Sequence, residues 1–336
     1  MNGPDTKSWS ALQQAGTDRR LRILTWHVHG NYLYSLGHLP HEIYVPVSTG
    51  GEPGYGPLGD RIPWGGNMHE LAPQELQRYE FDCIIYQSRS NWEDGQRLLT
   101  PSQRRLPCVY LEHNPPEPHA AESRHLFAHE RGMLVHVTTY NALMWDNGDT
   151  PWRVVEHGVA PPVVQPPAET LARGIVVVNH LHRRGRRLGA DLFTQARRTL
   201  ALDLIGMESE RLRGLGEIPN MEVAAFMARY RYFFSPVRYG SLSLALIEAM
   251  MAGLPVVGVG TTALPGVVSN GVDGYVDTDM RRLMDVMRTL ATDEAMARQW
   301  GLAAQSMARR RFGIERFVDD WNTLLQELAL EVSHGE

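Results

Sequence analysis

Residues 235–275 constrain the fold of this chain more than any other segment. Their sequence, SPVRYGSLSLALIEAMMAGLPVVGVGTTALPGVVSNGVDGY, predicts a small polar loop at 240–243, a short helix at about 244–252 and a strand at 256–259. A Gly-Leu-Pro sequence would end the helix. The strand lacks polar residues, which is typical of a strand buried on both faces of a parallel sheet. The segment therefore predicts an α/β protein.

The same segment predicts a binding site for an anion. The loop before the helix is small and polar enough to leave backbone N–H groups free, and it consists of Gly240, Ser241, Leu242 and Ser243. The helix begins at about Leu244 and points the positive end of its dipole at that loop. Glu248 lies among apolar residues of the helix, where an unpaired carboxylate is costly. A ribose diol would satisfy it, so these residues predict a nucleotide-sugar site.

These residues resemble the donor-binding half of family 4 glycosyltransferases of the group 1 type. Members carry Glu-Gly-Phe-Gly, Glu-Ala-Met-Ala-x-Gly-x-Pro-Val-Val, Pro-Glu-Val-Val and Asp/Asn-Gly-x-x-Gly, and this chain supplies SLSLALIEAMMAGLPVV, LPGVV and NGVDGY. Two positions depart from the pattern. The first acid of the family's Glu-x7-Glu pair falls on Gly240, and the acid of Pro-Glu-Val-Val falls on Gly266. In the family, the neighbourhood of the first acid contacts the transferred sugar.

The resemblance implies the GT-B fold, in which two Rossmann-like, doubly wound domains face a cleft. The chain has 336 residues, enough for two domains with their own cores. We expect a disordered lead-in without the apolar core of a signal peptide. The expected parts are this lead-in at 1–20, an acceptor-side domain at 21–160, a linker at 161–171, a donor domain at 172–316, and a helix at 317–336 that crosses back to the first domain.

Apolar runs alternate with segments of helical spacing along most of the chain, which predicts parallel, doubly wound sheets. The expected strands are 21–28, 41–47, 81–87, 108–112, 134–138, 152–156, 174–179, 202–206 and 232–235. The expected helices are 32–39, 188–199, 221–230 and most of the chain after residue 277. Residues 49–67 are rich in Gly and Pro, which predicts an ordered functional loop or a mobile flap.

Two strands of the first domain end in polar residues, where open α/β sheets bind ligands. His29, Gly30 and Asn31 follow the first strand and are expected to line the acceptor side of the cleft. His113 follows the strand at 108–112 and resembles the His-Asp-x-Pro strand end of the family. We expect it to donate a hydrogen bond to the donor sugar while backbone holds its other nitrogen. The alternative is a histidine that only caps the loop.

A basic cluster, HRRGRR at 182–187, follows the strand at about 175–178 and precedes the helix expected from 188. The resemblance places here an Arg and a Lys that neutralise the donor's diphosphate. The family's Lys corresponds to Arg184 or Arg187, depending on where a gap is placed, so we assign both to the diphosphate. Guanidinium groups suit bidentate phosphate contacts. The alternative is a solvated basic turn.

The remaining composition excludes several other functions. The net charge of −5 gives no bulk reason to bind nucleic acid. His27 and His29 lie on one face of a strand, but further ligands at metal spacing are not evident, so we expect neither a metal nor a cofactor. Cys83 and Cys108 lie in apolar runs, which favours buried thiols and a cytoplasmic protein. A lipid acceptor would require peripheral contact with the membrane, and the oligomeric state stays open.

The resemblance thus implies a retaining, metal-independent glycosyltransferase that moves a sugar from a nucleoside diphosphate to a glycan, lipid-linked or small-molecule acceptor. The main alternative is a degenerate GT-B protein that binds a nucleotide or sugar without turnover, because Gly240 and Gly266 stand where acids are usual. A Rossmann-type oxidoreductase or epimerase ranks lower. That class requires a Gly-x-Gly-x-x-Gly motif after the first strand, and the sequence has none there.

Overall fold

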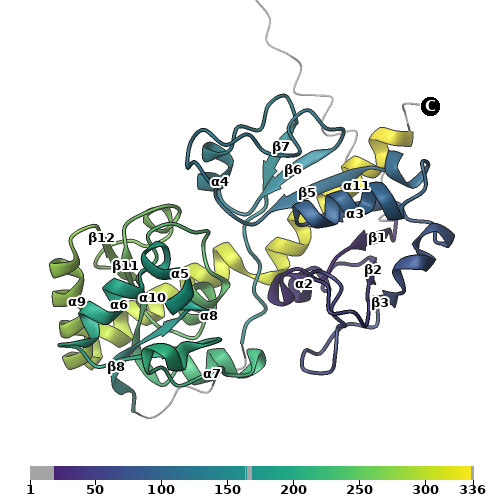
Figure 1. The fold of residues 1–336 in the computed structure, drawn as a ribbon. Coiled ribbons are helices and arrows are strands. Elements are labelled where there is room, and N and C mark those ends of the chain that lie inside the picture. Colours follow the sequence, from purple (N-terminus) through teal and green to yellow (C-terminus); the bar gives the residue numbers. More distant parts are fainter. Residues whose placement is uncertain (1–18, 163, 165–168, 334–336) are drawn as a thin grey trace, which may run out of the picture.

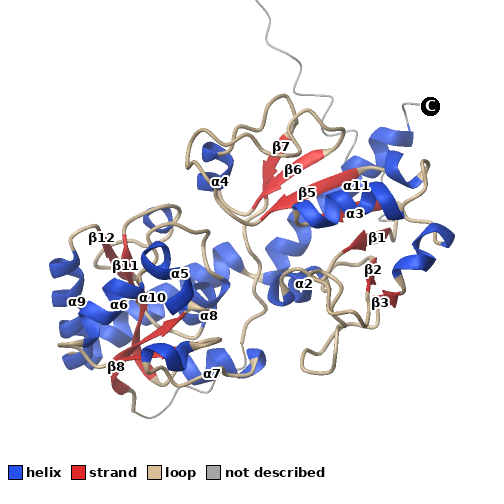
Figure 2. Ribbon diagram, in the orientation of Figure 1, coloured by secondary structure: helices blue, strands red, loops and turns tan. Residues whose placement is uncertain are grey.

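The computed structural model describes residues 19–162, 164 and 169–333, and the lead-in expected at 1–20 lies largely outside this range. The chain forms two parallel sheets, each between layers of helices (Figures 1 and 2). This confirms the predicted α/β class. The part of the linker at 163 and 165–168 also lies outside the described residues.

The first sheet has seven parallel strands in the order β3-β2-β1-β4-β5-β6-β7. Its strands are β1 (Arg22–Thr25), β2 (Glu42–Pro46), β3 (Met68–Leu71), β4 (Cys83–Tyr86), β5 (Cys108–Glu112), β6 (Met133–His136) and β7 (Trp152–Val154). Its α-helices are α2 (Gly30–Leu36), α3 (Arg89–Leu98) and α4 (Thr139–Met144). All four residues of β4 are buried, as expected for a strand covered on both faces. The strand order reverses direction between β1 and β4, and such switch points carry ligand sites.

The second sheet has five parallel strands in the order β12-β11-β10-β8-β9. Its strands are β8 (Leu171–Val177), β9 (Leu202–Ile205), β10 (Tyr230–Ser235), β11 (Val256–Val259) and β12 (Gly274–Asp277). Its helices are α5 (Leu181–Leu188), α6 (Ala190–Arg197), α7 (Val223–Met227), α8 (Leu244–Met251), α9 (Met280–Thr292) and α10 (Glu294–Phe312). The order reverses between β8 and β10, so both sheets have a switch point.

Several expected boundaries were wrong. The helix expected at 221–230 ends at Met227, and β10 already begins at Tyr230, because that tyrosine is buried in the sheet rather than on a helix face. The basic cluster lies inside α5 instead of before a helix. Gly185 interrupts that helix with φ 54° and ψ −138°, a conformation that glycine adopts without strain. Strand β3 was not expected, and β8 begins at Leu171, inside the expected linker.

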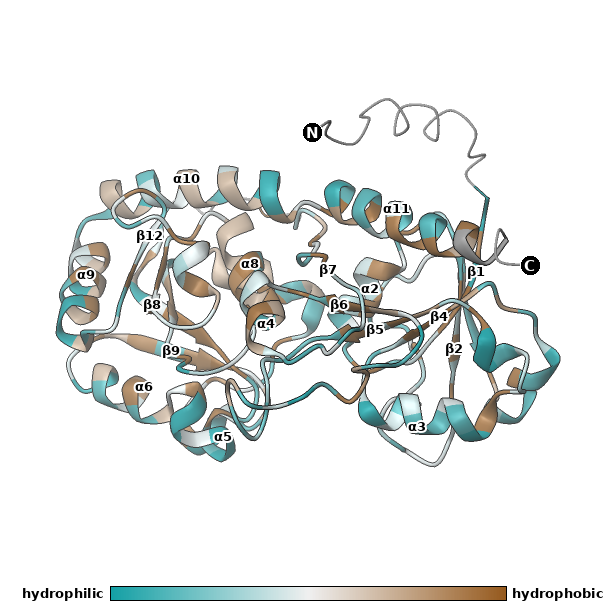
Figure 3. Cartoon of the chain, turned by 90° about the horizontal axis from the view of Figure 1, so that it is seen from above, coloured by the Kyte–Doolittle hydropathy of each residue, from teal (hydrophilic) through white to brown (hydrophobic). Residues whose placement is uncertain are grey.

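The last helix, α11 (Ile314–Ser333), packs on the first domain, whereas α10 packs on the second (Figure 3). It begins three residues earlier than expected, directly after Gly313. Phe317, Trp321 and Leu325 of α11 are fully buried in the first core. The chain therefore passes between the domains twice, and the two crossings pair where Val159 N donates to Phe312 O at 2.8 Å.

Gly158 allows the two crossings to approach. A Cβ atom built at Gly158 would lie 2.2 Å from Cβ of Phe317, closer than side chains can pack. Beside it, Arg311 donates two hydrogen bonds to the carboxylate of Glu156, with Nη2 to Oε1 at 2.6 Å and Nε to Oε2 at 2.9 Å. Such a bidentate pair is geometrically specific. These contacts hold the two crossings against each other.

Candidate functional site

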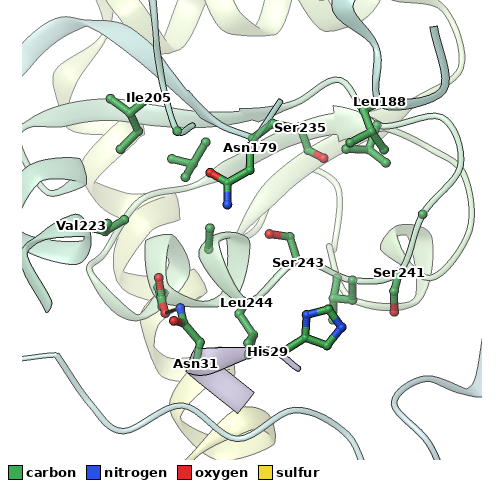
Figure 4. Close-up of a pocket in the computed structure, with 18 of the residues that line it drawn as sticks. His29, Asn31, Asn179, Leu188, Ile205, Val223, Ser235, Ser241, Ser243 and Leu244 are labelled. Atoms are coloured by element: carbon green, nitrogen blue, oxygen red, sulfur yellow. Dashed lines mark hydrogen bonds between the residues drawn. The ribbon is translucent and has the colours of Figure 1, made fainter. Parts of the chain in front are cut away.

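A cleft of about 510 Å³ lies between the carboxyl ends of the two sheets. Of the predicted site residues, all except Arg187 line it: His29, Gly30, Asn31, His113, Arg184, Gly240, Ser241, Leu242, Ser243, Leu244 and Glu248. The residues expected on the acceptor side and those expected on the donor side thus share one cleft (Figure 4). Both sheets contribute through the segments that follow their switch-point strands.

The loop before α8 presents free backbone donors. Within the described part of the chain, the amide N–H groups of residues 241–245 have no hydrogen-bond acceptor. Ser243 is the N-cap residue with extended backbone (φ −78°, ψ 135°), but its hydroxyl does not cap the helix. These N–H groups and the positive end of the helix dipole can together bind an anion.

Glu248 lies in the second turn of α8 and faces the cleft. The side chain is half-buried by surface exposure, but protein atoms surround the carboxylate closely, and this burial raises its pKa to about 7. Asn31 Nδ2 donates a hydrogen bond to Glu248 Oε1 at 3.3 Å and opposes that rise. The group is therefore close to half-ionised at neutral pH, and a ligand that donates hydrogen bonds would favour its charged form.

Arg184 and Arg187 lie in α5 but have different surroundings. Arg184 lines the cleft, and among the described residues its guanidinium has no hydrogen-bond or ion-pair partner. The Arg184 side chain is exposed at the surface, but protein atoms around its guanidinium and the nearby charge of Arg187 lower its pKa, and the group stays charged. Arg187 instead pairs with Glu117 of the first domain and donates to Tyr239 O at 3.1 Å. The structure therefore separates the two arginines that we assigned to one role.

A chain of hydrogen bonds determines the tautomer of His113. Thr25 Oγ1 donates to Ile85 O at 2.9 Å, so it accepts from Gln87 Nε2, also at 2.9 Å. Gln87 Oε1 is then the acceptor for His113 Nε2 at 3.0 Å. Nδ1 of His113 therefore carries no proton.

This tautomer changes the expected role of His113. We expected the ring to donate to a sugar while backbone held its other nitrogen. In the structure a side-chain amide holds Nε2, and Nδ1 can only accept a hydrogen bond, for example from a sugar hydroxyl. Burial, together with His29 and His157, holds the pKa of His113 well below its usual value, so the ring stays neutral.

The sequence interpretation missed further residues of the cleft. Asn179 follows β8, its Oδ1 accepts from Met207 N at 2.9 Å, and its amide nitrogen points into the cavity (Figure 4). Its position after a switch-point strand was the signal that could have identified it. His157 lies 4% exposed in the wall and its Nε2 donates to Leu242 O at 3.0 Å. This contact joins residues 85 positions apart, so no local pattern in the sequence indicates it.

The described residues contain no cluster of three or more His, Cys, Asp or Glu side chains arranged to hold a metal ion. No helix among them has the length and apolar character needed to cross a membrane. Cys83 and Cys108 are buried free thiols, as the sequence predicted.

Residues 187–293 match the family model described as glycosyl transferases group 1. Among sequence relatives, the chain is 28% identical over 98 residues to N-acetyl-alpha-D-glucosaminyl L-malate synthase of Bacillus anthracis, covering 29% of this chain and 26% of the relative. It is also 28% identical over 83 residues to an uncharacterized 41.2 kDa protein in the cps region of Klebsiella pneumoniae, 23% of which is covered. The matches thus span about a quarter of the length of these relatives.

Solved structures resemble nearly the whole chain. Sucrose-phosphate synthase from Thermosynechococcus elongatus superposes with a TM-score of 0.70 at 16% identity, covering 92% of this chain and 99% of that one. HepE of Anabaena, solved in complex with UDP-glucose, superposes with a TM-score of 0.67 at 16% identity, covering 92% and 100%. These comparisons confirm the GT-B fold and the resemblance to group 1 glycosyltransferases.

Proposed function

We propose that this chain is a glycosyltransferase that binds a nucleoside diphosphate sugar in the cleft and transfers the sugar to an acceptor with retention of anomeric configuration. The observation that carries the proposal is the convergence of three groups in one cleft: the free N–H groups before α8, the unpaired guanidinium of Arg184, and the half-ionised carboxylate of Glu248. The match to group 1 glycosyltransferases supports it.

Each of these groups suits one part of a nucleotide sugar. The ribose diol would donate to Glu248, whose second oxygen has no partner among the described residues. The diphosphate would lie between Arg184 and the N-terminus of α8. The negative charge that develops on this leaving group as the glycosidic bond breaks would be stabilised by those donors. In this proposal neither a metal nor a cofactor is required.

The donor sugar would lie toward His113. Nδ1 of this ring would accept from a sugar hydroxyl, which orients the sugar without a charged group. Gly240 would leave the sugar without the acid that the family places there. A Cβ at Gly240 would lie 3.3 Å from Val237 Cγ1, so this part of the wall is packed closely by apolar atoms. Main-chain N–H groups of residues 241–244 would instead donate to oxygens of the sugar, whereas the family's carboxylate would accept from its hydroxyls.

The acceptor would approach from the first domain, and its chemistry is not assigned beyond a glycan, lipid-linked or small molecule. The neighbouring structures include proteins solved with UDP, such as HepE and the pneumococcal O-GlcNAc transferase GtfA. UDP is therefore the first nucleotide to test. The proposal places the protein in the cytoplasm, with at most peripheral contact with the membrane.

The test is release of nucleoside diphosphate from a panel of nucleotide sugars, with and without acceptors from a cell extract. We expect slow hydrolysis of one donor without acceptor, faster turnover with acceptor, and a product of retained configuration by NMR. Tight nucleotide binding with no release from any donor would support the alternative, a protein that binds without turnover. The observation that favours this alternative is the glycine at position 240.

A further inference from the structure

Among the described residues, four hydrogen bonds join the first domain to the segment that carries the donor site. They are Tyr239 Oη to Pro116 O at 2.8 Å, Asn141 Nδ2 to Ser241 Oγ at 3.3 Å, His157 Nε2 to Leu242 O at 3.0 Å, and Asn31 Nδ2 to Glu248 Oε1 at 3.3 Å. Of these, only the last involves a group that titrates and that the proposed nucleotide would contact. It joins residues 217 positions apart.

Asn31 is well placed to act on Glu248. It lies in the first turn of α2, a helix held rigidly because Ser35 donates to Gly158 O at 2.7 Å and Tyr32 is buried. The Asn31 side chain points from α2 into the cleft (Figure 4). Its amide contacts Oε1 of Glu248 and leaves Oε2 available. The carboxylate thus has one oxygen fixed by the opposite domain and one oxygen open to a ligand.

We propose that Asn31 is a positioning residue for the donor site, which orients the Glu248 carboxylate for the ribose. Because Asn31 lies on the first domain and Glu248 on the second, this orientation depends on how the two domains are arranged. The inference rests on the proposed function for its nucleotide. Asn31 was expected on the acceptor side, and the geometry assigns it to the donor instead. Opening of the cleft would break this bond and leave the Glu248 carboxylate without its partner from the first domain, so nucleotide binding would weaken.

The charges around Glu248 support this assignment. Burial raises the pKa of Glu248 to about 7, and the Asn31 hydrogen bond is the cause that lowers it. The first domain contributes three histidines to the cleft, namely His29, His113 and His157, and burial lowers the pKa of each. They titrate below their ordinary value of 6.5.

The second domain contributes Arg184, which stays charged, and the exposed carboxylate of Glu217. Tyr32 lies on α2, and burial raises the pKa of its hydroxyl. Among the residues that line the described cleft, Glu248 is the carboxyl whose pKa burial raises to about 7. A pH dependence of binding that disappears in Glu248→Gln is therefore assigned to this residue.

The direct test measures the Glu248 carboxyl by carbon-13 NMR, with its signal assigned by its loss in Glu248→Gln. Asn31→Leu keeps the volume of the side chain and removes the donor. We expect its Glu248 pKa to rise by about one pH unit, since a hydrogen bond to a carboxylate favours the charged form. Tyr239→Phe is the matched control, because it removes another hydrogen bond between the domains without contacting Glu248. Its titration should equal that of the wild type.

The second readout is the affinity for UDP by calorimetry between pH 6.5 and 9. A rise from about 7 to about 8 would lower the ionised fraction at pH 7 from roughly one half to one tenth, so Asn31→Leu should bind about fivefold more weakly at pH 7 and recover by pH 9. If Asn31→Leu does not fold, Asn31→Asp serves instead. Two carboxyls at this distance would share a proton, and the apparent pKa should rise further.

The outcomes separate the two proposals. An unchanged Glu248 titration in Asn31→Leu would overturn the positioning role, even if UDP binds. A shifted titration with no UDP binding at any pH would show that Asn31 acts on Glu248 across the domains, but it would refute a role of this pair in nucleotide binding. If UDP binds and its pH dependence disappears in Glu248→Gln but is unaffected by Asn31→Leu, the proposed function stands and this inference fails.

Discussion

At the scale of the residue, the ionisation of Glu248 should make nucleotide binding at the proposed donor site depend on pH. Its pKa, about 7 in the folded chain against 4.5 ordinarily, means that the folded state binds a proton more tightly than the unfolded state between these values. The free energy of unfolding without ligand should therefore fall as pH rises from about 4.5 to 7.

The proposed contact with the ribose requires the charged form of Glu248, so nucleotide binding should strengthen over pH 6 to 8 and release a proton. Calorimetry in buffers of different ionisation enthalpy measures that proton.

Replacing Glu248 by Gln should weaken UDP binding by about 1.5–3 kcal/mol at pH 8, the contribution of a hydrogen bond to a charged group. The fold should be unaffected, because the shape is retained. The pH dependence of binding should disappear as well. Glu217→Gln changes an exposed carboxylate of the same cleft and serves as the control. Unchanged affinity in Glu248→Gln would make this acid structural.

His113 should act on the sugar and leave the nucleotide alone. His113→Ala removes the Nδ1 acceptor, so release of nucleotide from the donor sugar should be lost or reduced at least tenfold, while UDP affinity should stay within about twofold. The predicted tautomer adds a check by nitrogen-15 NMR, which should show a proton on Nε2 and a bare Nδ1. Equal losses in UDP binding and sugar release would point instead to collapse of the buried network with Gln87.

At the scale of the element, α5 carries both Arg184, the proposed phosphate ligand, and Arg187, which pairs with Glu117 of the first domain. Arg184→Ala should reduce affinity for UDP about tenfold or more and for uridine little, because the guanidinium acts on phosphate charge. Added salt should mimic the loss partially. Arg183→Ala alters an exposed cation of the same helix and should have a small effect.

Arg187→Ala is the informative companion, since it pairs with Glu117 across the cleft. We expect it to weaken UDP binding less than Arg184→Ala does. If the two variants lose UDP and uridine binding equally, α5 does not contact the diphosphate.

At the scale of the whole molecule, the two crossings between the domains depend on a glycine. Gly158→Ala would place a methyl group 2.2 Å from Cβ of Phe317, and overpacking of this kind costs about 1–3 kcal/mol. Urea unfolding should show a lower midpoint. Gly266→Ala is the control, because no atom lies within 4 Å of its added Cβ. A loss of stability as large in the control would show that the effect is not specific to the crossing.

Much of this protein follows from local patterns in its sequence. The run that contains Val256 and Val257 lacks polar residues, and both side chains are fully buried in the structure. Such local patterns were enough to predict the parallel sheet, the helix before this strand and the order of the elements. The free amides before α8 and the position of Glu248 follow from the same segment. The ends of helices and strands were predicted less accurately from the sequence. Tyr230 begins a strand instead of ending a helix, because packing in the sheet overrides helical spacing.

Tertiary structure alone decided which groups meet. Arg184 and Arg187 are three residues apart and equivalent by composition. Among the described residues, the fold gives only the Arg187 guanidinium partners, namely Glu117 on the opposite domain and the carbonyl of Tyr239. The same holds for Asn31 and Glu248, whose contact joins two domains. Even the protonated nitrogen of His113 depends on Gln87, 26 residues away, and on the strand beyond it. Local sequence determines which chemical groups each element carries, and the packing of the two domains determines their partners and their charge.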